Sequence, residues 1–181
     1  WDASFEYLNT FNKYLITHIL VPMKTAYLAM PVIATFVLLL GLAYILAGLR
    51  STWIVFFLLL FIALSEYWDR ALITAYMATF AVVTAGVIGI LTGVVCAQNP
   101  WSSRAILFLC DFFQTFPSFI YLIPVILLFG ITDTSVIIAA IVYAAVPATR
   151  FTVEGLKSVP AVIQDAGSMS GVSRIQRLVS I

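Results

Sequence analysis

Charge is the property that this sequence has least of. Only 9% of its 181 residues are charged, whereas a soluble domain carries about 25%. Hydrophobic residues make up 63% of the chain, and its mean hydropathy is +1.10. So few charges cannot cover the surface of a soluble domain, and a net charge of +1 offers no basic patch for nucleic-acid phosphates. The composition argues against a soluble enzyme, a disordered tail or a nucleic-acid partner, and it indicates a protein of the lipid bilayer.

Residues with reactive or metal-binding side chains are also scarce. The two cysteines, Cys96 and Cys110, lie in apolar runs, which is typical of buried hydrophobic residues rather than of disulfides or metal ligands. The single histidine, His18, has no Cys, His or carboxylate at ligand spacing. The chain also has no G-x-x-x-x-G-K-[ST] phosphate loop. We therefore expect a non-catalytic chain that binds no metal or cofactor itself.

Long runs without Asp, Glu, Lys or Arg dominate what is present. A helix needs about 20 apolar residues to cross roughly 30 Å of hydrocarbon. The runs that reach or approach this length are 25–49, 51–65, 71–103, 112–132 and 134–149. The second run is short, and so is the last, which ends at Arg150, whose long side chain can reach the interface. We predict an all-α, polytopic membrane protein with about five transmembrane helices within residues 28–150.

The distribution of Lys and Arg predicts an external N-terminus. If the segment after the fifth span is cytoplasmic, six basic residues fall inside and three outside, as the positive-inside rule requires. The inner six are Arg50, Arg104, Arg150, Lys157, Arg174 and Arg177, and the outer three are Lys13, Lys24 and Arg70. Residues 1–27 carry apolar and aromatic residues at steps of three and four, which favours an amphipathic helix at the external interface.

Small residues form a stripe on the third predicted span. Ala81, Ala85, Gly89 and Gly93 recur at every fourth position, and such a stripe lets another helix approach closely. The partner helix can belong to the same chain or to a second copy of it.

The fourth predicted span carries polar residues next to two prolines. Pro117 and Pro124 each remove a backbone donor, so we expect kinks there. Asp111, Gln114, Thr115 and Ser118 lie at helical spacing and form one polar face. A carboxylate in a membrane helix is costly, so either this face lines a translocation path or Asp111 hydrogen-bonds helix ends near the cytoplasmic interface. Broken helices that line a cavity favour a transporter over an inert anchor. The candidate path residues are Asp111, Gln114, Thr115, Phe116, Pro117, Ser118 and Tyr121.

The segment 151–181 is more polar and is predicted to be cytoplasmic. The sequence Ser158-Val159-Pro160 is typical of a helix start. Apolar residues follow at helical spacing, and Gly171 can end that helix before a second short one begins. Helices of this kind suit docking into a groove on another protein, or they form an ordinary connecting loop. The chain stops at Ile181 within a helical pattern, so we expect it to be a piece of a longer protein.

Two stretches carry a family resemblance. Residues 165–171, with the sequence DAGSMSG, resemble the E-A-A-x-x-x-G coupling loop of ABC-importer permeases, with Asp165 in place of Glu and Gly167 in place of the second Ala. Residues 113–124, with the sequence FQTFPSFIYLIP, and the following 128–130 resemble the glycine betaine/proline-type branch of that family. Further matching positions are Arg150, Thr152, Gly155, Val159 and Pro160.

The resemblance implies a function and a set of partners. The chain would be a permease subunit in the inner (cytoplasmic) membrane that moves glycine betaine, choline, proline, carnitine or an amine oxide. Its partners would be a second permease copy, ATPase subunits that hold ATP and Mg, and an external or periplasmic binding protein. The residues implied in coupling to the ATPase are Val159, Pro160, Val162, Ile163, Asp165, Ala166, Gly167, Met169 and Gly171.

Two other classes remain open, a secondary transporter and a structural membrane subunit. A secondary transporter would be expected to show internal repeats, and we find no similarity between 28–65 and 71–149.

Overall fold

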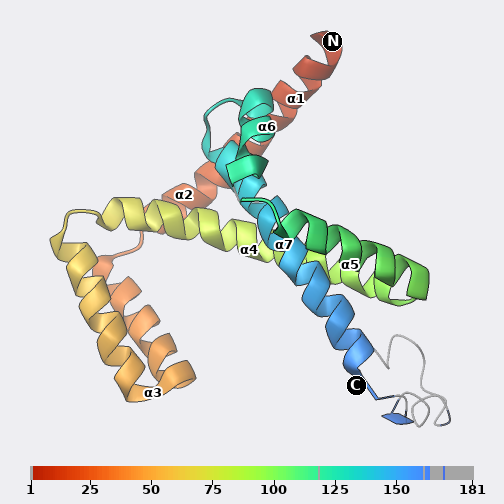
Figure 1. The fold of residues 1–181 in the computed structure, drawn as a ribbon. Coiled ribbons are helices and arrows are strands. Elements are labelled where there is room, and N and C mark those ends of the chain that lie inside the picture. Colours follow the sequence, from red (N-terminus) through yellow and green to blue (C-terminus); the bar gives the residue numbers. More distant parts are fainter. Residues whose placement is uncertain (1, 118, 161, 164–168, 170–181) are drawn as a thin grey trace. The chain divides into compact units, whose positions relative to one another are not determined.

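A computed structural model describes residues 2–117, 119–160, 162–163 and 169, and its regular structure in these ranges is helical throughout. The elements are α1 (Asp2–Leu15), the π-helix η1 (Ile16–Leu20), α2 (Val21–Leu28), α3 (Val32–Leu64), α4 (Trp68–Ala97), α5 (Pro100–Gln114), α6 (Phe119–Phe129) and α7 (Asp133–Ser158) (Figure 1). Among these, α3, α4 and α7 are long and apolar enough to cross a membrane, and the sharply bent pair α5–α6 is a fourth candidate span. The predicted all-α, polytopic fold is confirmed.

The helices begin and end at residues whose chemistry explains the boundaries. Asn99 caps α5, because its side-chain oxygen accepts the Trp101 N–H at 3.0 Å, and Pro100 occupies the first turn, where no donor is needed. Gly130 ends α6 with a positive φ of 74°, and its N–H donates to the Ile126 carbonyl at 2.8 Å.

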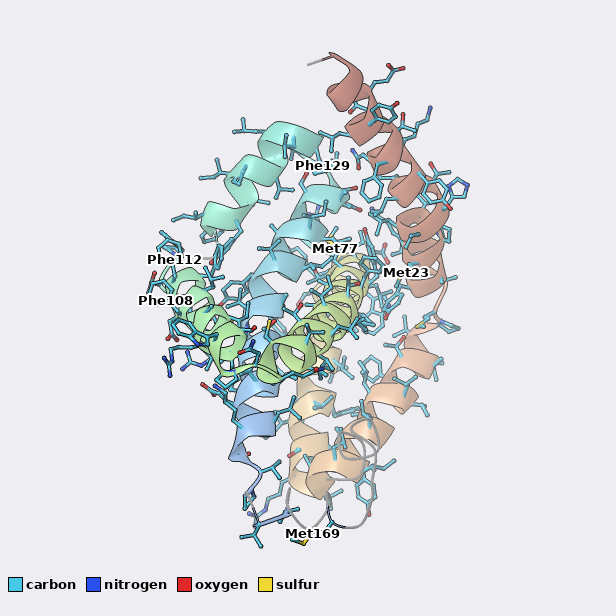
Figure 2. The ribbon with its side chains drawn as sticks, turned by 90° about the vertical axis from the view of Figure 1, so that its right-hand side faces the viewer. Met23, Met77, Phe108, Phe112, Phe129 and Met169 are labelled. Atoms are coloured by element: carbon cyan, nitrogen blue, oxygen red, sulfur yellow. The ribbon has the colours of Figure 1, made fainter. Side chains whose placement is uncertain are left out.

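A single glycine divides α3 into two helical arms. Gly48 has φ 75° and ψ −178°, a conformation that glycine adopts most readily. Figures 1 and 2 show the arms meeting at one end, and the Phe36 and Phe56 rings approach edge to face across them, with centroids 6.4 Å apart. The sequence placed the boundary between the first two spans at Arg50, two residues later. Those two predicted spans are therefore found as the arms 32–47 and 49–64 of one kinked helix.

The N-terminal segment is helical almost throughout. The predicted amphipathic helix over 1–27 is found as α1, η1 and α2, with the π-helical turn Ile16–Leu20 between the two α-helices. Tyr7, Phe11 and Tyr14 expose their rings, and His18 stacks on Tyr14 with centroids 4.4 Å apart. Exposed aromatic residues suit a membrane interface, and this location stays a prediction.

The chain forms two compact units. The first comprises residues 1–80 and 125–137, and the second comprises residues 81–124 and 138–181. Helices α4, α6 and α7 contribute residues to both.

In the first unit, Asp133 joins three helices. Its carboxylate accepts hydrogen bonds from Lys24 of α2 at 2.9 Å and from the hydroxyl of Tyr76 of α4 at 2.6 Å. Tyr76 is fully buried. Tyr27 adds a second tie between α2 and α4, because its hydroxyl donates to Thr79 at 3.1 Å.

Removing the Asp133 carboxylate should destabilise this unit more than removing its cationic partner. We expect Asp133→Ala to lower the free energy of unfolding of the full permease by about 2 kcal/mol, because the buried Tyr76 hydroxyl loses its acceptor. Lys24→Met should cost less than about 1 kcal/mol, because a half-exposed ion pair contributes little. Unfolding in detergent measures both, with the exposed Asp69→Ala as the control. Equal stability of all three variants would contradict the assignment.

In the second unit, α4 and α7 approach closely at two glycines. A Cβ atom on Gly89 would lie 2.4 Å from the Cβ of Ala148, and one on Gly93 would lie 2.5 Å from the Cβ of Thr152. Ala85, one turn earlier on the stripe, is also buried. At these two glycines the small-residue stripe packs against a helix of the same chain, which is one of the two alternatives that the sequence left open.

Adding a methyl group at this contact should separate the two helices. We expect Gly89→Ala to destabilise the permease by about 1–3 kcal/mol, because backbone atoms of α7 must move to make room. Gly86→Ala on the same helix is the matched control, since nothing lies within 4 Å of its added Cβ. That control should be neutral or slightly stabilising, because alanine favours the helix. Thermal unfolding of both variants in detergent tests the pair, and equal losses would refute close packing.

Candidate functional site

The predicted interruption of the fourth span is found at Pro117. Helix α5 ends at Gln114, and α6 begins at Phe119, where the chain is sharply bent. Pro117 has no N–H to continue the α5 hydrogen-bond ladder, while its carbonyl accepts the N–H of Ile120 at 3.0 Å. Pro124, the second predicted breaker, lies inside α6 and does not end it.

Arg150 of α7 forms hydrogen bonds with two polar residues of α5. Its Nη1 donates to Asp111 at 2.5 Å and to Gln114 at 3.1 Å, and its Nε donates to Glu154 at 2.9 Å. The Arg150 side chain is one-third exposed and that of Asp111 is 60% exposed. We call these four residues the Arg150 cluster. It ties α5 to α7 and surrounds one cation with two carboxylates.

Two other candidate path residues bond to the end of α5. The Thr115 hydroxyl donates to the Phe112 carbonyl at 2.7 Å, and the hydroxyl of the buried Tyr121 donates to the Phe113 carbonyl. Both carbonyls belong to the last turn of α5, where they also accept the backbone N–H groups of Thr115 and Phe116 at 3.2 and 3.3 Å. Thr115 and Tyr121 thus bond to a helix end, whereas Asp111, for which the sequence left that alternative open, bonds to the Arg150 side chain.

The remaining candidate path residues lie at the bend. Phe116 is half-buried, with its ring edge to face on Phe112 at 4.9 Å, and Pro117 is exposed. Ser118 lies outside the described residues. The rings of Phe108 and Phe112, labelled on α5 in Figure 2, are both exposed. A role of these residues in a translocation path stays a prediction.

Sequence reasoning missed the Arg150 cluster as a unit. The Arg150–Glu154 pair was readable, because opposite charges four residues apart meet on a helix. The Asp111–Arg150 pair joins residues 39 positions apart, and nothing local in the sequence specifies which helices pack together. The described residues contain no group of three or more His, Cys, Asp or Glu that could hold a metal ion.

The segment that follows α7 begins at the predicted helix start, Ser158-Val159-Pro160. Helix α7 runs past the predicted span end at 149 to Ser158, and it continues through both Pro147 and Gly155. Val159 and Pro160 interrupt it, and the Ile163 N–H donates to the Pro160 carbonyl at 3.0 Å as a helix resumes at 162–163. Val162 is 77% exposed and Met169 is 89% exposed (Figure 2). Asp165, Ala166, Gly167 and Gly171 lie outside the described residues.

Comparison with known families identifies the class. Residues 85–181 match the family described as binding-protein-dependent transport system inner membrane component. The match includes α5, α6, α7 and the segment after α7, and it covers more than half of the chain. The chain therefore belongs to this family, which confirms the resemblance to ABC-importer permeases.

Individual relatives are similar over different lengths. The chain is 55% identical over all of its 181 residues to the trimethylamine N-oxide transport system permease protein TmoV of Pelagibacter ubique. It is 38% identical over 180 residues to the TmoV of Ruegeria pomeroyi, and 33% identical over 114 residues to the glycine betaine/proline betaine permease protein ProW of Salmonella typhimurium. The chain spans only 25% of the length of the first relative and 27% of the second. The match to ProW covers 63% of this chain and 32% of ProW.

Neutralising Asp111 should separate its structural role from a role in transport. Asp111→Asn keeps the side-chain shape and an acceptor for Arg150, so we expect the stability of the full permease to change by less than about 1 kcal/mol. If the polar face lines the path, the initial rate of solute uptake per permease should fall about tenfold, because an interaction with a charged group is worth about 1.5–3 kcal/mol. Uptake by proteoliposomes measures this, with Glu154→Gln as the control. An unchanged rate per molecule with less protein in the membrane would mean that Asp111 is structural.

Proposed function

We propose that this chain is part of the permease of an ABC importer that carries trimethylamine N-oxide, or a closely related methylated amine, across the inner membrane. The observation that carries the proposal is the 55% identity, over the whole chain, to a permease named for trimethylamine N-oxide transport. A second relative with that name matches 99% of the chain. The relatives named for glycine betaine match about two-thirds of it or less, so the amine oxide is favoured over the betaines.

The segment after α7 is proposed to dock on a partner ATPase subunit that holds ATP and Mg²⁺. The exposed apolar side chains of Val162, Ile163 and Met169 support this, because each would gain about 1.5–3 kcal/mol on full burial in a groove. The permease itself would be non-catalytic, and its partners would include a second permease copy and a substrate-binding protein. That protein would select the solute, since methylated amines are held by aromatic cages.

The Arg150 cluster would link this docking segment to the membrane helices. Arg150 lies two helical turns before the end of α7, so a displacement of the docking segment would be transmitted along α7 to its contact with Asp111. Contacts with two discrete arrangements are the usual means by which local displacements drive larger transitions. In this proposal, the Asp111–Arg150 contact changes between the outward-open and inward-open states.

Reconstitution of the full permease with its ATPase and binding protein tests the function. We expect trimethylamine N-oxide bound to the binding protein to stimulate ATP hydrolysis, and uptake into proteoliposomes to require ATP rather than an ion gradient. Val162→Glu should abolish the stimulation, because a buried charge without a partner is costly, whereas the isosteric Val162→Thr should largely retain it.

Each alternative has a distinct result in this assay. Uptake that follows an ion gradient without ATP would identify a secondary transporter, and no uptake under either condition would identify a structural subunit. Normal stimulation in the Val162→Glu variant would refute docking through this segment.

A further inference from the structure

An open groove lies in the second unit, between α5 and the ends of α4 and α7. Its volume is about 620 Å³, which is within the range of about 300–1,000 Å³ that is typical of small-molecule sites. Apolar side chains form much of its wall. The residues that matter here are Pro100, Arg104, Phe108, Asp111, Leu156 and Lys157.

The charges in this groove are not balanced. Arg104 and Lys157 are both exposed, and neither forms an ion pair or a hydrogen bond through its side chain within the part of the chain that the structure describes. The one carboxylate in the lining, Asp111, is already paired with Arg150 at 2.5 Å. Among the described residues, the groove therefore presents two positive charges without a paired carboxylate, which attract an anion.

An exposed tryptophan beside the groove suits a position at the level of lipid headgroups. Trp101, in the first turn of α5, is 79% exposed, and tryptophan is enriched where a membrane helix meets the headgroups. Phe108, two turns further along, lines the groove and keeps its ring exposed (Figure 2). Arg104 lies between them, so α5 presents an interfacial aromatic, a cation and then an apolar surface in that order.

We propose that this groove binds the headgroup of an anionic phospholipid, with the phosphate between Arg104 and Lys157 and an acyl chain along Phe108. Basic pockets between membrane helices are known sites for such headgroups. The apolar wall favours a lipid over free phosphate, because free phosphate would gain nothing from Phe108 or Leu156. The predicted orientation puts both cations on the cytoplasmic side, where anionic lipids create a negative surface potential.

A lipid in this position would bridge two helices. Arg104 belongs to α5 and Lys157 to the last turn of α7, next to the break at Val159 and Pro160. A shared phosphate would hold these helix ends together, as Asp111 and Arg150 do two turns away. This site does not depend on which solute the permease carries.

Lipid binding to the full permease in detergent, measured by native mass spectrometry, tests the proposal. We expect phosphatidylglycerol to remain bound and phosphatidylcholine to be lost. Arg104→Gln should weaken phosphatidylglycerol binding about fivefold, and Arg104→Gln with Lys157→Gln about 30-fold, from about 1 kcal/mol for each charge. Arg50→Gln removes an exposed charge on the same predicted side that does not line the groove, so it is the control and should bind normally.

Several results would overturn the proposal. Equal retention of both lipids, or unchanged binding by the double variant, would show that the groove is not an anionic-lipid site. Glycerol 3-phosphate binding as tightly as phosphatidylglycerol would assign it to a soluble phosphate. Loss of ATPase co-purification with unchanged lipid binding would make it a protein contact. Arg104→Lys should keep lipid binding, so its failure to do so in a folded permease would also count against the proposal.

Discussion

Compensation of a few charges in a strongly apolar chain is the constraint on which this structure depends. A lipid environment makes an isolated charge costly, and the chain meets this cost by joining helices through ion pairs. Asp133 binds Lys24 and Tyr76 in the first unit, and Arg150 binds Asp111 in the second. Each pair joins residues far apart in the sequence, so the same contacts that neutralise charge also fix which helices are neighbours.

Close packing of small residues is the second kind of contact that holds the helices together. Apolar side chains gain little by leaving lipid for one another, so membrane helices associate through close backbone approach. Gly89 and Gly93 leave no room for a side-chain carbon against α7. This contact and the Arg150 cluster both act on α7, the helix that leads into the proposed docking segment. Helix α7, which is proposed to transmit motion, is therefore held against α4 by close backbone packing and against α5 by the Arg150 cluster.

The sequence predicted the helices well and their partners poorly. Runs without charge located the membrane helices, and Pro117 located the break between α5 and α6, because both depend on local chemistry. The predicted boundary between the first two spans, at Arg50, was wrong by two residues. It was taken from the charged residue, whereas the chain turns at Gly48. The pairing of Asp111 with Arg150 required knowledge of which helices pack together. The residues 165–168 and 171, which carry much of the family resemblance, were identified from sequence pattern alone.

The kink at Gly48 has a consequence for the surrounding bilayer. Each arm of α3 has a length of about 24 Å at a rise of about 1.5 Å per residue, which is shorter than the roughly 30 Å of hydrocarbon in a typical membrane. A hydrophobic segment that is too short makes the bilayer thin around it, at a modest free-energy cost for each ångström of mismatch. The N-terminal arms are thus best matched to a thin membrane, and acyl-chain length becomes a variable that acts on this region independently of headgroup charge.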